Sequence, residues 1–157
     1  MGIFRDFSVG ADNVVYSMNF AATDMNPDTW SYYTEFEPGF ALFMASIKTY
    51  VNSNYYFFMG TVFVIYMIGV NYIIQKECEN KVLALFFLVG LLYYTLSFNI
   101  MRQCTALSLF CFVIPLLREK NKWYIMLYCA LVLLITFYVH RSFIVMLLLP
   151  IVIFNRR

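Results

Sequence analysis

The residues best suited to chemistry fall into two polar clusters set within apolar stretches, and the first contains Asn99, Arg102 and Gln103. If a helix starts near Asn99, these residues and Ala106 stand at i, i+3, i+4 and i+7, on one helix face. Arginine keeps its charge in a low dielectric, and its planar fork suits a phosphate or a carboxylate. The alternative is an arginine that extends from an ordinary helix end into water.

The second cluster is the sequence His140, Arg141 and Ser142, which contains the only histidine of the chain. It combines an imidazole, a cation and a hydroxyl. Imidazole is suited to general acid or base catalysis near neutral pH. The alternative is a polar turn in which Ser142 caps the next helix.

Carboxylates that could join these clusters lie in the first third of the chain, at Asp12 and Glu37. They could pair with the arginines or accept hydrogen bonds from sugar hydroxyls. Spacing alone favours turn chemistry for Asp12, and for Glu37 a charge at the positive end of a helix that starts at Pro38. The four cysteines form no CxxC pair and have no histidine nearby, so no metal or redox site is predicted.

Composition defines the elements that must position these residues. The chain is 62% hydrophobic and only 13% charged, whereas an ordinary soluble domain is about 25% charged. We therefore predict an all-α, polytopic helical membrane protein. About five transmembrane helices are expected, over residues 55–75, 82–98, 104–117, 123–139 and 142–154. The third run would rise only about 21 Å against a bilayer core of about 30 Å, and extending it back to Asn99 brings Arg102 below the membrane surface.

Charge is divided unevenly along the chain and predicts its orientation. Residues 1–54 carry two basic and six acidic side chains, whereas residues 55–157 have a net charge of +6. The connections at 76–81, 118–122 and 155–157 hold seven of the eleven basic residues, so we predict that they are cytoplasmic and that both polar clusters are external. No basic run is long enough to predict nucleic-acid binding.

Two regions are therefore expected. Residues 1–54 are an acidic external segment with a short interfacial helix over 40–51. Residues 55–157 are a transmembrane region that forms part of a longer domain, because an external first segment needs a preceding helix to carry it across the membrane.

Several of these residues form motifs that resemble the EpsG family of bacterial exopolysaccharide polymerases, which is Wzy-like. The motifs are Arg5 with Gly10-Ala11-Asp12 and Tyr16, then Glu37-Pro38-Gly39-Phe40, then Asn99-x-Met101-Arg102-Gln103-x-x-Ala106, and finally His140-x-Ser142. The block around Arg102 followed by His140-x-Ser142 is the most specific part. Ala11 departs from the family pattern, in which Thr or Ser is more usual.

The resemblance implies a multi-pass glycosyltransferase of the bacterial cytoplasmic (inner) membrane. Such enzymes join polyprenyl-diphosphate-linked oligosaccharide repeats at the external face, in exopolysaccharide, O-antigen or capsule synthesis. Arg102, with Arg141 or Arg5, would hold the diphosphate, and His140, Asp12 or Glu37 would activate the acceptor hydroxyl. Further substrate contacts are expected from Asn99, Gln103 and Ser142. A cationic clamp could replace a metal cofactor, and the partners would be the lipid bilayer and other polysaccharide assembly proteins.

Two other functions are compatible with the same clusters. A membrane O-acyltransferase of polysaccharide could use His140, and would transfer labelled acetyl groups without a lipid diphosphate. A non-catalytic transport or assembly subunit would keep its polymer length and linkages after His140→Ala or Arg102→Ala.

Overall fold

A computed structural model describes residues 12–30, 36–91, 100–119 and 121–154. Within these ranges every regular element is a helix and none is a strand, which confirms the predicted all-α class. The α-helices are α1 (Asn13–Ala22), α2 (Pro38–Tyr50), α3 (Tyr55–Glu77), α4 (Lys81–Gly90), α6 (Met101–Val113), α7 (Lys122–Tyr138) and α8 (Leu149–Phe154). The 3₁₀ helices are η1 (Pro27–Thr29), η2 (Ile114–Glu119) and η3 (Arg141–Leu148).

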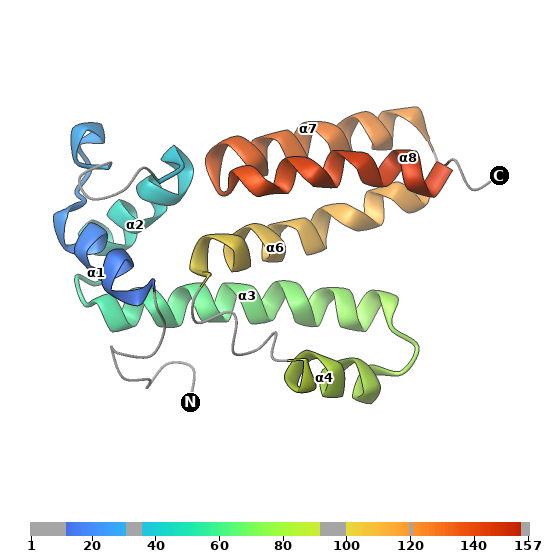
Figure 1. Cartoon of the computed structure of the whole chain (residues 1–157), viewed down its shortest axis with the longest axis horizontal. Coiled ribbons are helices and arrows are strands. Elements are labelled where there is room, and N and C mark those ends of the chain that lie inside the picture. Colours follow the sequence, from blue (N-terminus) through green and yellow to red (C-terminus); the bar gives the residue numbers. More distant parts are fainter. Residues whose placement is uncertain (1–11, 31–35, 92–99, 120, 155–157) are drawn as a thin grey trace.

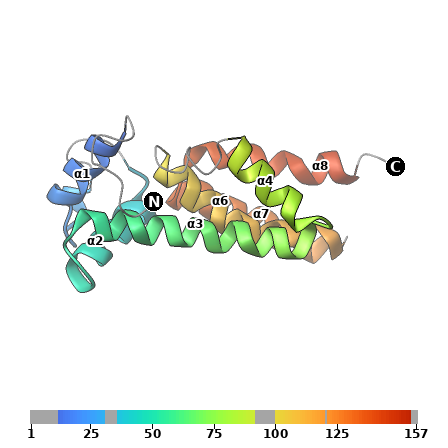
Figure 2. The same cartoon turned by 90° about the horizontal axis from the view of Figure 1, so that it is seen from below.

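The helical bundle has two distinct ends along its long axis. In Figure 1, α3, α6, α7 and α8 run along the long axis, and α1 and α2 gather at one end of it. The start of α6 and the turn from α7 into η3 lie at this α1–α2 end, whereas the α3–α4 and η2–α7 connections lie at the opposite end. Figure 2 shows α4 alongside α3. The prediction that the Arg102 and His140 clusters share one end is therefore confirmed.

Among the residues that the structure describes, two helices are long and apolar enough to cross a membrane. α3 has 23 residues with a mean hydropathy of 2.0, and α6 continues through η2 to give a 19-residue helix with a mean hydropathy of 1.3. Pro115 lacks the N–H that an α-helix would need, which explains the tighter 3₁₀ turns after Val113. The other predicted spans correspond to shorter apolar helices, and residues 92–98 lie outside the described part.

The outer surface of the helices is strongly apolar. α4 buries none of its residues, and Val82, Phe86 and Phe137 are each more than 60% exposed. A soluble monomer rarely exposes large contiguous apolar patches. In a bilayer the same side chains face hydrocarbon, so this surface supports the membrane interpretation.

α3 and α6 are brought together by small residues. A Cβ on Gly69 would lie 2.3 Å from Ser108 Oγ and 2.6 Å from Ser108 Cα. The Ser108 hydroxyl donates to the carbonyl oxygen of Ile65 at 2.6 Å. Close contact through small residues is typical of helix pairs in membranes, and it fixes the helix that carries Arg102.

α2 is anchored more firmly than a helix lying shallowly in the interface. It buries Phe40, Ala41, Met44 and Ala45. Lys48 interrupts the apolar pattern for a structural reason: its Nζ donates to the carbonyl oxygens of Ala21 and Thr23, at 2.6 and 2.7 Å. A cation at these carbonyls stabilises the C-terminal end of α1.

Candidate functional site

Glu37 lies at the centre of the polar cluster at the α1–α2 end. It is only 4% exposed. Its Oε2 accepts a hydrogen bond from Arg102 Nη1 at 2.9 Å, and its Oε1 accepts one from the backbone N–H of Arg141 at 3.1 Å. Although Glu37 occupies the N-cap position of α2, its side chain does not cap that helix. The carboxylate therefore lies at the helix end where the sequence placed it, and it also forms an ion pair with an arginine from another helix.

The Glu37-Pro38-Gly39 sequence explains how this carboxylate is positioned. Pro38 starts α2 at a position where a missing N–H costs nothing. A Cβ on Gly39 would lie 2.5 Å from the carbonyl oxygen of Tyr138 and 2.7 Å from its Cβ. Only glycine allows the start of α2 to touch the end of α7, and this contact carries Glu37 to the N–H of Arg141.

Arg102 is held on three sides. Its Nη1 binds Glu37, its Nε donates to Tyr16 Oη at 3.4 Å, and its guanidinium carbon lies 4.6 Å from the ring centroid of Phe36. The backbone N–H of Arg102 also donates to Tyr16 Oη, at 3.5 Å. The side chain is 25% exposed, and Nη2 has no hydrogen-bond partner among the described residues. The guanidinium therefore has a fixed orientation with one nitrogen available, rather than extending freely into water.

His140 lies against the same carboxylate. Its Nδ1 is 3.4 Å from Glu37 Oε1, and its side chain is 14% exposed. In the described part of the chain, neither ring nitrogen has a hydrogen-bond partner. Burial lowers the pKa of His140, and the charge of Arg102 adds to this effect, while the Glu37 carboxylate opposes it. The imidazole is therefore neutral at neutral pH.

The Glu37 carboxylate stays ionised despite its burial. Burial alone would raise its pKa, but the backbone N–H of Arg141, its own N–H and the charge of Arg102 together hold the pKa of Glu37 below its usual value. Burial raises the pKa of Tyr16, and the bond with Arg102 reduces that rise. The cluster thus combines an anion, a cation and two neutral groups.

The other predicted site residues are less closely involved. Arg141 contributes its backbone N–H while its side chain is exposed, and Asp12, Gln103 and Ser142 are also exposed. His140, rather than Ser142, occupies the N-cap position of η3, and no side chain caps that helix. The α6 helix starts at Met101, between the start of the predicted run at Cys104 and its possible extension to Asn99. Arg5 and Asn99 lie outside the described residues.

Sequence reasoning did not assign Tyr16 and Phe36 to the site. Tyr16 belongs to the predicted motif with Gly10-Ala11-Asp12, and this was the signal that could have found it. Phe36 had no such signal, because the high aromatic content of the chain made it indistinguishable from core residues. Among the described residues, no group of three His, Cys, Asp or Glu side chains could hold a metal ion.

An apolar cavity of about 270 Å³ adjoins the cluster. It is lined by Gly39, Phe40, Phe43, Ile65, Thr105, Leu109 and Val139. Gly39 lies two residues after Glu37, and Val139 directly precedes His140. The polar cluster therefore borders a space suited to a hydrocarbon group.

The helical fold, the two long apolar helices and the exposed apolar surface are those of a membrane protein with a buried ion-pair site at one end. The family model of the EpsG family matches residues 2–157, so the chain belongs to this family. Among curated proteins and solved structures, none matches the chain. Membership of the EpsG family supports a role in exopolysaccharide biosynthesis with a polymerase-like function.

Proposed function

We infer that this chain carries the catalytic cluster of a glycosyltransferase of the bacterial inner membrane, which joins polyprenyl-diphosphate-linked oligosaccharide repeats into exopolysaccharide. Family membership supports the process. One observation carries the chemistry: a buried carboxylate, Glu37, binds Arg102 and lies beside His140, whose ring nitrogens have no hydrogen-bond partner in the described part.

His140 is the proposed general base. The acceptor hydroxyl oxygen forms a bond to the anomeric carbon of the donor sugar as the bond from that carbon to the diphosphate oxygen breaks. The hydroxyl proton passes to Nε2 of His140. This requires the other proton to be on Nδ1, which faces Glu37 Oε1 at 3.4 Å. That distance is longer than a normal hydrogen bond, but such contacts often shorten when substrate binds. The carboxylate then stabilises the imidazolium that forms.

Arg102 is proposed to bind the leaving diphosphate. Its Nε and Nη1 are engaged by Tyr16 and Glu37, so Nη2 is the nitrogen free to meet a phosphate oxygen. A fixed cation aimed at developing negative charge stabilises the transition state without a metal ion. The exposed side chain of Arg141, the next residue after His140, is the candidate for a second cation, and Arg5 remains a third. Asp12, Asn99, Gln103 and Ser142 remain proposed substrate contacts.

The apolar cavity beside the cluster suits the prenyl chain of such a donor. It is lined by residues of α2, α3 and α6 and by Val139 at the end of α7. We propose that the α1–α2 end faces the outside of the cell, because four of the basic residues that the structure describes lie at the opposite end: Lys76, Lys81, Arg118 and Lys122.

Polymer length, resolved on a gel, tests this function in cells that carry the full-length gene with Arg102→Ala. We expect collapse to single repeat units at normal protein abundance in the membrane, because removing one preorganised charge donor typically costs about 10²–10³ in rate. The matched control is Lys81→Ala, an exposed cation at the opposite end, which should leave polymer length unchanged. Unchanged polymer length in Arg102→Ala would refute the proposed role. Loss of labelled acetyl transfer instead would favour the O-acyltransferase.

A further inference from the structure

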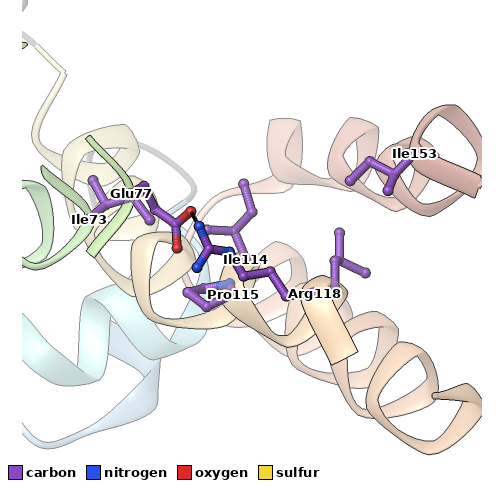
Figure 3. Close-up of a pocket in the computed structure, with 7 residues that line it drawn as sticks. Ile73, Glu77, Ile114, Pro115, Arg118 and Ile153 are labelled. Carbon is purple, nitrogen blue, oxygen red and sulfur yellow. Dashed lines mark hydrogen bonds and ion pairs between the residues drawn. The ribbon is translucent and has the colours of Figure 1, made fainter. Parts of the chain in front are cut away.

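A second cavity lies at the opposite end of the molecule, away from Glu37. It has a volume of about 530 Å³ and is formed by the last turns of α3, by η2 and by α8. Figure 3 shows its lining side chains. These are Ile73, Glu77, Ile114, Pro115, Leu117, Arg118 and Ile153. The volume is within the range of small-molecule sites, and the walls are hydrocarbon apart from one acid and one base.

The two polar residues form an ion pair, and each keeps polar atoms that have no hydrogen-bond partner among the described residues. Arg118 Nη2 donates to Glu77 Oε2. The Arg118 side chain is 58% exposed, and its other guanidinium nitrogens have no hydrogen-bond partner among the described residues. Glu77 Oε1 is buried and has no hydrogen-bond donor within the described part of the chain. A buried carboxylate oxygen without a donor is unfavourable, because its lost hydration is not replaced by a hydrogen bond.

We propose that this cavity binds a phospholipid whose headgroup carries a phosphate and a primary ammonium, such as phosphatidylethanolamine. The phosphate accepts hydrogen bonds from the exposed guanidinium of Arg118, and the ammonium donates to Glu77 Oε1. One acyl chain lies along the isoleucine walls of the cavity. The headgroup thus satisfies both unused groups of the ion pair, and the inference is independent of the glycosyltransferase reaction.

The position of the cavity along the helices supports a lipid headgroup. α3, a 23-residue helix long and apolar enough to cross a membrane, ends at Glu77. At the same end, α7 starts with Lys122 followed by Trp123, which is 66% exposed. Tryptophan and lysine are typical of the boundary between hydrocarbon and headgroups. The ion pair therefore lies where a phosphate and an ammonium are found.

The charge pattern selects this headgroup over two others. An anionic lipid such as phosphatidylglycerol has no ammonium for Glu77 Oε1, and its charge would be repelled by that carboxylate. Phosphatidylcholine has the same charges as phosphatidylethanolamine, but its methylated nitrogen has no N–H to donate. Comparing these three lipids with identical acyl chains therefore isolates the hydrogen bond to Glu77.

The test measures binding of these three lipids to the full chain, purified in detergent, by native mass spectrometry. We expect phosphatidylethanolamine to bind about tenfold more tightly than either other lipid, because it alone donates a hydrogen bond to the charged Glu77 carboxylate. Glu77→Leu, which removes the acceptor oxygen, should abolish the preference over phosphatidylcholine, and Arg118→Gln should weaken binding of all three. Lys122→Gln, which changes an exposed cation nearby, should preserve the preference.

Equal binding of the three lipids by the unmodified protein would overturn the proposal, and that comparison needs no variant to fold. A preference for phosphatidylglycerol would show an anionic-lipid site and would also overturn it. The same holds if Glu77→Leu keeps its fold and retains the full preference for phosphatidylethanolamine.

Discussion

The ion pair between Glu37 and Arg102 should contribute much more to the free energy of unfolding than the ion pair between Glu77 and Arg118. The side chains of the first pair are 5% and 25% exposed, and those of the second 26% and 58%. Exposed pairs contribute about 0–1 kcal/mol, whereas removing one partner of a buried pair costs about 3–5 kcal/mol. Arg102 keeps a quarter of its side chain exposed, so we expect Glu37→Gln to destabilise the protein by roughly 2–3 kcal/mol.

A double-mutant cycle with Glu37→Gln and Arg102→Gln measures the coupling directly. The free energy of unfolding is determined by titrating the full chain with SDS in mixed micelles. We expect a coupling of about 1.5–2 kcal/mol for Glu37 with Arg102, and at most about 0.5 kcal/mol in the parallel cycle for Glu77 with Arg118. If the Glu37 and Arg102 effects add to within about 0.3–0.5 kcal/mol, the two side chains are not energetically coupled and the cluster described here is wrong.

Two further predictions follow from the same contacts. Gly39→Ala should destabilise the protein by about 1–3 kcal/mol and shorten the polymer, because the added Cβ would lie 2.5 Å from the carbonyl oxygen of Tyr138. The control is Gly90→Ala, whose added Cβ would have its nearest atom at 3.9 Å. Equal unfolding free energies for the two variants would contradict the contact between Gly39 and Tyr138. The unfolding free energy should fall as the pH drops below 6.5, the ordinary pKa of histidine, because the folded protein binds the His140 proton more weakly than the unfolded chain does. Stability lost through Glu37, whose folded pKa lies below 4.5, should begin only at lower pH. His140→Gln should remove the first decrease and keep the second, and an unaltered pH profile in that variant would refute the burial of the imidazole.

The helices could be predicted from the sequence because hydropathy is a local property. The run at 55–75 became α3, Tyr55–Glu77, and the run at 123–139 became α7, Lys122–Tyr138. The ends of these helices follow from local caps, since Asn54 and Asn121 each accept a hydrogen bond from a backbone N–H in the first turn. The position of the two polar clusters at one end could be predicted because successive membrane spans alternate in direction, so every second connection lies on the same side.

The partners within the site could not be predicted in the same way. Glu37 binds Arg102, 65 positions away, and the N–H of Arg141, 104 positions away. Spacing on one helix contains no information on such contacts. It therefore favoured the local interpretation, a charge at the start of α2. The contact between Gly39 and Tyr138 also joins residues that are far apart in sequence, and it sets the position of Glu37.

The structure also narrows the choice of base, which the sequence left open between His140, Asp12 and Glu37. Both carboxylate oxygens of Glu37 already accept hydrogen bonds, and its pKa is lowered, so it is a poor proton acceptor. Asp12 is exposed at the start of α1. His140 is neutral, and its Nε2 has no partner among the described residues. A base must have both a free lone pair and a neutral resting state near the working pH. These observations support the proposal that His140 transfers the proton, and that Glu37 orients His140 while it holds Arg102.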